Sequence, residues 1–181
     1  DETGAVCKGL RIAVSIDGGR IRTREYKGRR RKSTRRYRFE GKWREPKVFV
    51  IYQLDENGRR DRKGLFIYGT TMGDADRCFE LLAAQLRRLG VHFSRQVVFI
   101  ADGASWIWNR VEALLAETGI SRSIVTETVD FYHVAKRLND VVGEKSNWTD
   151  AQRKRWVKDQ IRHLRCGNLG KFQSECDVIT A

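Results

Sequence analysis

The sequence has no long hydrophobic run. No apolar stretch approaches the ~20 residues that a membrane-spanning helix needs, so only the charge of the chain favours a membrane, and we expect no membrane partner. Internal repeats and low-complexity tracts are also missing. The 181 residues are enough for one domain with a buried core, with room for an appended segment.

Cysteine is scarce, and its positions do not form a pattern. The chain has no C-x-x-C pair and no zinc-type spacing of Cys and His, so neither a disulfide framework nor a zinc site is expected. Cys78 lies in an apolar helical stripe, which favours a small buried hydrophobe. This usage predicts a reducing compartment. The four cysteines are Cys7, Cys78, Cys166 and Cys176.

Acidic residues are outnumbered. Lys and Arg total 36 against 23 Asp and Glu, which gives a net charge of +13 and a pI near 10.0. A balance this basic predicts a polyanionic partner, nucleic acid first and an anionic membrane surface second.

The positive charge is densest between the first two predicted strands. Within residues 20–38 only Glu25 opposes eleven basic residues. Such a run repels itself, and phosphates would neutralise it with release of counterions. We expect a long, mobile hairpin arm that contacts backbone phosphates without reading bases; the alternative is a solvated loop. The basic residues are Arg20, Arg22, Arg24, Lys27, Arg29, Arg30, Arg31, Lys32, Arg35, Arg36 and Arg38.

Three strands are predicted in the first half of the chain. Residues 11–17 alternate apolar and polar side chains, and residues 47–54 form a β-rich apolar run. A hairpin signal at 55–58 precedes a returning strand at 65–68. These strands can pair as an antiparallel meander.

The second half alternates helices with strands. A helix is expected at 75–89 after a capping-box-like start formed by Thr71 and Asp74, followed by a short apolar strand at 96–101. A second helix ends at Gly119. A weaker strand (123–129) and a third helix (131–142) complete the order βββαβαβα. This α/β order, with a mixed sheet, is that of the ribonuclease-H-like fold.

The character of the chain changes after residue 142. A polar break at 143–147 precedes a capping box, Thr149 with Gln152, and a basic helix; residues 167–181 show no clear pattern. We therefore expect a ribonuclease-H-like core at 1–142 and a basic helical segment at 143–181.

That basic helix should continue to about Arg165. Its cations are further candidate nucleic-acid contacts, foremost Arg153, Lys154 and Arg155.

Two aspartates follow strands that should be parallel neighbours. Asp17 ends the first strand, Asp102 follows the fourth, and a glycine follows each. Because the carboxyl ends of such strands open onto one edge of the sheet, we expect the two carboxylates to share a divalent cation, Mg²⁺ or Mn²⁺. Taken singly, each Asp–Gly pair is also ordinary turn chemistry. Metals held here would serve phosphodiester cleavage.

Five blocks of the sequence resemble DDE transposases of bacterial insertion sequences, distantly the Mutator-like group. They are SIDGGRIRTRE, WREPKVFVIYQLDENG, GTTMGDAD, VVFIADGASWIWNRV and VDFYHVAKRL. The resemblance implies that Asp17 and Asp102 are the first two catalytic acids of DNA hydrolysis and strand transfer at transposon ends. It further implies transposon and target DNA as partners, a homo-oligomeric full-length protein, and a nucleoid-associated location in the bacterial cytoplasm.

The same resemblance implies a third carboxylate, usually Glu, on a helix beside the sheet. The basic helix from Thr149 is similar to the start of the helical insertion that precedes it in relatives. We therefore expect the third acid beyond Ala181, with Glu144 and Glu175 as the candidates inside the chain.

Asp130 and His133 form a D-F-Y-H junction between a strand and a helix. In the structural interpretation, Asp130 caps the helix by accepting a hydrogen bond from the amide of His133. In the functional one, Asp130 is a further metal ligand and His133 contacts the scissile phosphate or a water. Similar junctions occur in related transposases.

Three tryptophans could stack on extruded bases, although core packing is favoured. They are Trp43, Trp106 and Trp108, of which the last two cannot both face the core from one helix.

Other functions stay open. The strongest is a non-catalytic nucleic-acid-binding module on the same fold, such as a truncated or domesticated transposase. The I-D-G-G at Asp17 also resembles the phosphate loop of sugar kinases and ATPases, but those need two such halves and this chain has the length of one. A structured-RNA nuclease is the third alternative.

Overall fold

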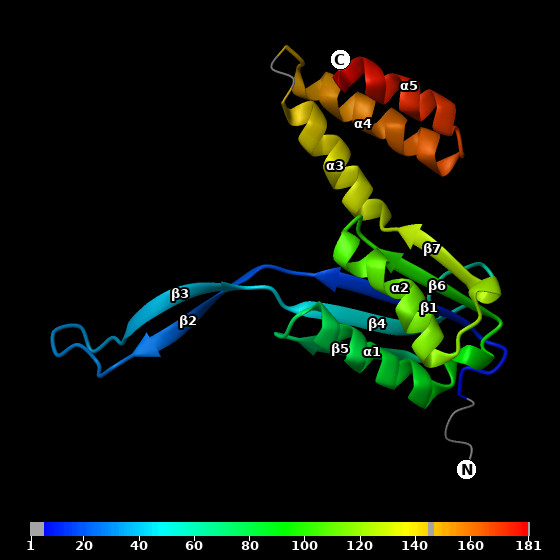
Figure 1. Ribbon diagram of the computed structural model, residues 1–181. Helices are drawn as coiled ribbons and strands as arrows, with labels where there is room; N and C mark the ends of the chain where they lie inside the picture. The colour runs from blue at the N-terminus through cyan, green and yellow to red at the C-terminus, as the bar shows by residue number, and fades with distance from the viewer. Residues whose placement is uncertain (1–5, 145–146, 181) are drawn as a thin grey trace. The chain divides into compact units, whose positions relative to one another are not determined.

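The computed structural model describes residues 6–144 and 147–180 of the chain, which form a mixed α/β structure (Figure 1). Five strands make a mixed sheet in the order β5-β4-β1-β6-β7, and β2 and β3 form a separate two-stranded sheet. The strands are β1 (Arg11–Gly18), β2 (Ile21–Lys27), β3 (Arg38–Arg44), β4 (Lys47–Leu54), β5 (Phe66–Thr71), β6 (Gln96–Ala101) and β7 (Val125–Val129). The α-helices are α1 (Ala75–Leu89), α2 (Ser105–Thr118), α3 (Phe131–Gly143), α4 (Asp150–Arg165) and α5 (Leu169–Thr180).

Strand β1 is the centre of the five-stranded sheet. It pairs antiparallel with β4 on one side and parallel with β6 on the other, and β4 pairs antiparallel with β5. The antiparallel meander predicted from the sequence is therefore confirmed. The parallel pairing of the first and fourth predicted strands is confirmed as well.

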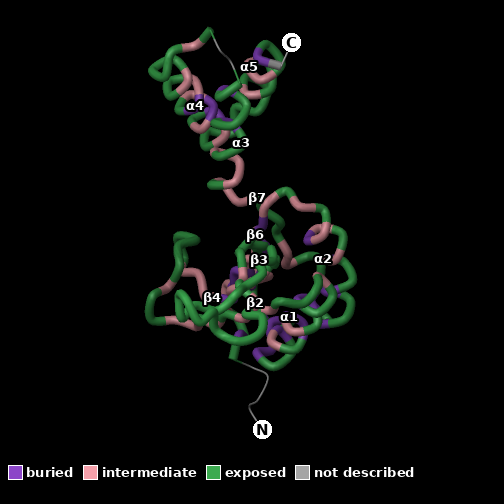
Figure 2. Tube along the Cα trace, turned by 90° about the vertical axis from the view of Figure 1, so that its left-hand side faces the viewer, coloured by how far each residue is buried: buried purple, intermediate pink, exposed green. Residues whose placement is uncertain are grey.

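The main core lies between the sheet and two helices (Figure 2). Alternate residues of β1, Ile12, Val14 and Ile16, are at most 2% exposed and pack with buried side chains of α1 and α2. Cys7 and Cys78 are fully buried here, and burial raises the pKa of the Cys7 thiol to about 11. Both behave as small hydrophobes, as the sequence predicted for Cys78.

Helices α1 and α4 begin after polar capping residues. The N-cap of α1 is Asp74, whose carboxylate accepts a hydrogen bond from the Arg77 amide, so the predicted limits 75–89 are confirmed while the capping role predicted for Thr71 is wrong. The helix ends on Gly90, in the left-handed conformation that favours glycine. The predicted capping box of Thr149 and Gln152 is present at the start of α4.

Two strands and one α-helix were not predicted, nor were the short 3₁₀ helices Val91–Phe93 and Arg122–Ile124. Strands β2 and β3 occupy the segment expected to be a mobile arm, so the order begins with five strands rather than three. Helix α5 occupies part of the segment that showed no pattern.

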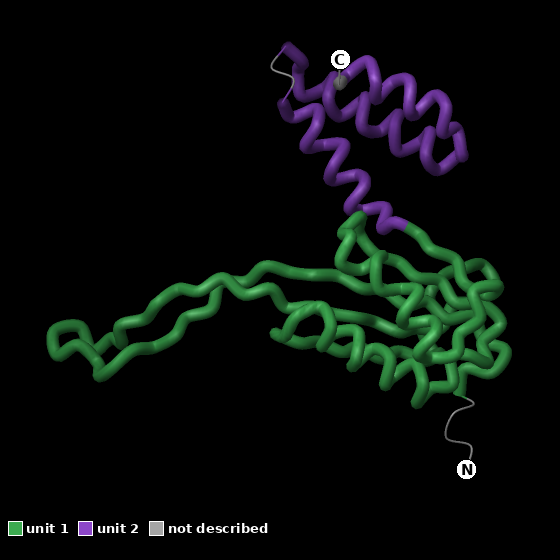
Figure 3. The backbone as a smooth tube through the Cα atoms, viewed as in Figure 1, with its two compact units in different colours: residues 1–128 green, residues 129–181 purple. Residues whose placement is uncertain are grey.

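The chain divides into two compact units, residues 1–128 and 129–181 (Figure 3). The division falls before the predicted boundary at 142/143, because α3 packs with α4 and α5 through Leu138, Val142, Val157 and Ile179. Residues 145 and 146 of the predicted polar break lie outside the described residues, as do 1–5 and 181. In the part of the chain that the structure describes, no helix is long and apolar enough to cross a bilayer.

Candidate metal site and nucleic-acid interface

Asp17 and Asp102 lie at the carboxyl ends of two adjacent parallel strands. Ile16 of β1 is paired with Ala101 of β6, and the next residue on each strand is one of the aspartates. Since neighbouring strands lie about 4.8 Å apart, the backbones of Asp17 and Asp102 lie close together at this edge of the sheet. The sheet thus brings together the two acids that the sequence singled out.

Each aspartate is held by a local turn. Oδ1 of Asp17 accepts a hydrogen bond from the Gly18 amide at 2.7 Å, and Oδ1 of Asp102 accepts one from the Ala104 amide at 2.9 Å. The indole Nε1 of Trp108 donates to the backbone oxygen of Asp102 at 2.7 Å. These bonds fix the backbone of both residues at the edge of the sheet.

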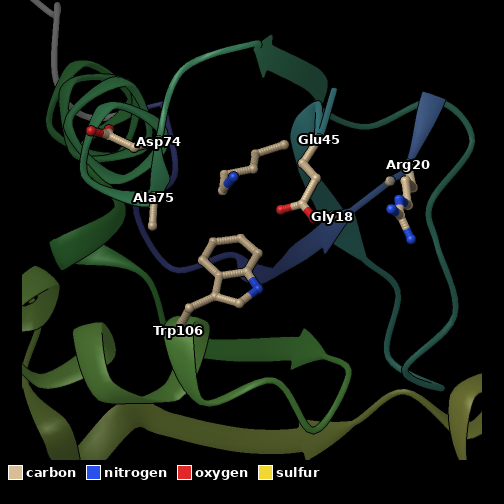
Figure 4. Close-up of a pocket in the computed structure, with 8 residues that line it drawn as sticks. Gly18, Arg20, Glu45, Asp74, Ala75 and Trp106 are labelled. Atoms are coloured by element: carbon tan, nitrogen blue, oxygen red, sulfur yellow. The ribbon is translucent and has the colours of Figure 1, made fainter. Parts of the chain in front are cut away.

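A cleft of about 540 Å³ is lined by Gly18 of β1 and by residues at the base of the ribbon and on α1 and α2, while neither Asp17 nor Asp102 lines it. Trp106 forms one wall: its ring meets Phe79 edge-on at 6.3 Å, and the Lys47 ammonium lies 5.4 Å from its centroid. Figure 4 shows Trp106 and the Glu45 carboxylate pointing into this cleft. The cleft therefore offers an aromatic surface with charges of both signs, one residue along β1 from Asp17.

The two tryptophans of α2 are both half-buried and pack against the core. Trp106 contacts Phe79 while Trp108 turns its indole N–H to the Asp102 backbone. The prediction that they cannot both face the core is therefore wrong, because both pack against it through different contacts. Trp43, in contrast, is 58% exposed on β3.

No group of three or more His, Cys, Asp or Glu side chains gathers as a metal site among residues 6–144 and 147–180. Among these described residues, Asp17 and Asp102 are the two acids that the register of β1 and β6 brings to one edge of the sheet. Mg²⁺ commonly binds proteins through one or two carboxylates, with water and substrate phosphates completing its octahedron. Two carboxylates at the ends of adjacent parallel strands fit that pattern.

The remaining predicted acids belong to the second unit. Asp130 is the N-cap of α3: its Oδ1 accepts from the Tyr132 amide at 2.9 Å, not from the His133 amide as predicted. His133 Nε2 lies 3.9 Å from Asp130 Oδ2. The capping role is therefore present, while the metal-binding role of Asp130 and the supporting role of His133 stay predictions.

The two fallback glutamates also lie in this unit. Glu175 accepts a hydrogen bond from the buried Gln160, lies 3.7 Å from His163 Nε2 and 3.9 Å from Lys171 Nζ, so it helps join α4 to α5. Glu144 is the exposed C-cap of α3. Of the basic candidates on α4, Lys154 and Arg155 are exposed, whereas Arg153 is half-buried and lies 3.5 Å from Asp150.

Strands β2 and β3 form an exposed ribbon, and the two sides of this ribbon differ. Register pairs Thr23 with Lys42 and Glu25 with Glu40, so these residues share one side, the ion-paired face. Two glutamates opposite one another would repel. They are balanced by Lys27, which bonds Glu40, and by Lys42 and Arg44, which lie 2.6 and 3.2 Å from Glu25.

These ion pairs lower the pKa values of both glutamates. The Lys42 ammonium, followed by the Arg44 guanidinium, lowers the pKa of Glu25, and the Lys27 ammonium lowers that of Glu40. The pairs are exposed, so each contributes little alone.

The other side of the ribbon carries arginines stacked on aromatic rings. The Arg20 guanidinium lies 4.9 Å from the Trp43 centroid, and that of Arg24 lies 4.7 Å from the Phe39 centroid. We call this side the arginine–aromatic face; it comprises Arg20, Arg22, Arg24, Tyr26, Phe39 and Trp43.

The tip of the ribbon, residues 28–37, is exposed throughout. Its backbone closes through hydrogen bonds from the Arg31 amide to Arg36 and from the Arg35 amide to Arg31, and Arg30 stacks on Tyr37 at 5.0 Å. All eleven predicted basic contacts of residues 20–38 thus lie on the ribbon or at its base. Their charge was evident from the sequence, but their division between two faces was not.

Comparison with known proteins does not assign a family. No family model matches the chain, and no curated protein or solved structure matches it. The proposals below therefore rest on the residues, their geometry and the resemblance of the sequence blocks.

Proposed function

We propose that this chain is the catalytic core of a DDE-type DNA transposase. In this proposal Asp17 and Asp102 hold Mg²⁺ or Mn²⁺ for phosphodiester hydrolysis and strand transfer at transposon ends. The observation that carries it is the register of β1 and β6, in which the pairing of Ile16 with Ala101 sets the two aspartates side by side. The five sequence blocks that resemble bacterial DDE transposases add the reaction class.

The proposal includes a ribonuclease-H-like fold for the first unit. Its support is the strand order β5-β4-β1-β6-β7, with an antiparallel meander on one side of β1 and a parallel neighbour on the other. The β2–β3 ribbon is an addition between the first two strands of that pattern.

Each residue near the aspartate pair has a role in the proposed reaction. Asp17 and Asp102 hold the divalent ion, which when bound supplies Lewis-acid activation of a water or 3′-hydroxyl. The missing side chains of Gly18 and Gly103 leave space for a phosphate. Lys47, held over Trp106, offers a positive charge to the DNA backbone beside the cleft.

Duplex DNA is the partner that the charge supports. The ribbon presents a dense exposed set of cations, and the net charge of the whole chain is +13. Transposon ends and target DNA, a homo-oligomeric full-length protein and a nucleoid-associated bacterial location belong to the same proposal.

A non-catalytic DNA-binding module is the second candidate. It is favoured by one observation: the described residues contain no third acidic side chain grouped with Asp17 and Asp102. The two candidates differ in metal binding, because a module without catalysis has no need of an ion at the aspartate pair.

The deciding test is Mn²⁺ titration by calorimetry on wild type, Asp17→Asn and Asp102→Asn. Asparagine keeps the oxygen that accepts the turn amide but removes the charge, so we expect the fold to persist and saturable Mn²⁺ binding to be lost in both variants. Mn²⁺-dependent nicking of plasmid DNA should be lost with it, while DNA affinity is unchanged or raised.

Asp61→Asn is the matched control. Asp61 accepts the Lys63 amide at 2.9 Å in a similar turn, away from the carboxyl edge of β1 and β6. Binding that is absent in wild type, or equal in all four proteins, would reject the enzyme and leave the DNA-binding module.

A further inference from the structure

Three arginines at the start of the ribbon lie on one of its sides. Arg22 and Arg24 share that side because they alternate with Thr23 in β2, and Arg20, in the link before β2, lies on it over Trp43. Residues two apart on a strand are separated by about 6.6 Å. The three guanidinium groups therefore form a row, and the aromatic residues of β3 lie beside them.

Each arginine side chain lies over a residue of β3. That residue is paired not with the arginine itself but with the residue two positions further along the chain. Arg20 lies over Trp43, the partner of Arg22, and Arg24 lies over Phe39, the partner of Tyr26.

Arg22 lies over Gly41, the partner of Arg24. A Cβ at Gly41 would be only 2.6 Å from Arg22 Nε, so the glycine leaves the space that this side chain occupies. The row is thus pre-organised before any ligand binds, which lowers the entropic cost of recognition.

Acidic side chains of the ribbon lie away from this row. Both glutamates of β2 and β3 are on the ion-paired face, where Lys27, Lys42 and Arg44 engage them. Within the described part of the chain, no ion pair joins Arg20, Arg22 or Arg24 to an acidic side chain. Their donors are available to a ligand.

Duplex DNA fits this row better than a single strand. The major groove admits a two-stranded β-ribbon, and arginine pairs in bidentate fashion with O6 and N7 of guanine. The spacing of the arginines, about 6.6 Å, is close to the axial rise of two base pairs. Base stacking on the aromatics is disfavoured, because guanidinium groups already cover one face of Trp43 and Phe39.

We propose that the arginine–aromatic face recognises guanine in the major groove of duplex DNA, with Arg20, Arg22 and Arg24 as specificity-determining residues. This inference rests on the proposed function for its partner, DNA, and goes beyond it in assigning sequence recognition to the ribbon. It also revises the expectation that the arm contacts phosphates alone.

The test is selection from a pool of duplexes of random sequence by the full chain in EDTA. Wild type should enrich sites with guanines spaced two base pairs apart. Arg22→Lys/Arg24→Lys keeps the charge but not the bidentate geometry, so we expect enrichment to fall about tenfold or more while affinity for unselected duplex stays within about twofold. Lys27→Arg/Lys42→Arg, on the ion-paired face, is the control and should enrich like wild type.

Three results would overturn the inference: no enrichment by wild type, equal enrichment by Arg22→Lys/Arg24→Lys, or tighter binding of wild type to the single strand of a selected site than to its duplex. The outcome is separable from that of the proposed function. Selection is done without metal, so enrichment can persist where Mn²⁺-dependent nicking fails, and nicking can persist where enrichment fails.

Discussion

Single residues decide how closely the strands of the sheet approach. Gly69 of β5 is paired with Phe49 of β4, and the Phe49 ring lies over the glycine. A Cβ at residue 69 would be 2.3 Å from Phe49 Cζ. Phe49 is 2% exposed and surrounded by the core, so its ring has no free space into which to move.

Replacing Gly69 with Ala should therefore destabilise the protein. We expect a loss of about 1–3 kcal/mol in the free energy of unfolding, the usual cost of overpacking a core. Urea denaturation followed by tryptophan fluorescence measures it. Gly103→Ala is the control, since nothing lies within 4 Å of a Cβ there. Equal stability of the two variants would show that Phe49 relocates at little cost.

The sequence predicted some of these residue positions and could not predict others. Asp17 and Asp102 were found because each ends an apolar strand, and strand ends are visible as a change in hydrophobic pattern. The position of the Arg22 side chain over Gly41 was not predicted, because it depends on the register of two strands that carry no hydrophobic pattern.

At the scale of elements, prediction succeeded where a core imposes a period. The buried strand β6 was predicted with its observed limits, and α1 and α2 with their terminal glycines. Strands β2 and β3 were not predicted, because cross-strand ion pairs and stacked arginines hold them together and neither side of the ribbon is buried. Helix α5 was not predicted because Ile179 is its one buried apolar side chain among the described residues, which is too few to impose a helical period on the sequence.

Replacing Gly41 of the ribbon with Ala should weaken the recognition of DNA without changing the stability of the fold. The new methyl group displaces the mobile end of Arg22, which can swing into solvent, so the free energy of unfolding should change little. Recognition by that arginine should weaken, and we expect guanine enrichment at one position of the selected site to fall several-fold. The same duplex selection measures it.

Thr23→Ala, on the ion-paired face, is a suitable control for Gly41→Ala. Its hydroxyl bonds only to the Lys42 backbone oxygen. If Gly41→Ala selects the same site as wild type, recognition by Arg22 does not depend on the position of its side chain over Gly41.

At the scale of the molecule, the affinity for DNA can depend on the net charge of the chain or on the charge of the ribbon in particular. If the ribbon binds phosphates, replacing Arg29, Arg30 and Arg31 with Ala should reduce the slope of log affinity against log salt. The expected reduction is about 0.9 for each phosphate that the variant no longer neutralises. Fluorescence anisotropy with a labelled duplex at several salt concentrations measures the slope.

The matched control removes three exposed charges elsewhere, by replacing Arg59, Arg62 and Lys63 with Ala in the β4–β5 connection. Both variants have the same net charge. If the two slopes fall equally, attraction depends on net charge and not on the ribbon.

The links at the base of the ribbon are short. Gly19 and Arg20 join β1 to β2, Glu45 and Pro46 join β3 to β4, and the Gly19 amide donates to the Pro46 oxygen at 2.9 Å. Proline fixes one backbone torsion, so one of the two links is stiff. A force that bends the ribbon therefore passes through the stiff Pro46 link into β4, whose Val48 is paired with Asp17.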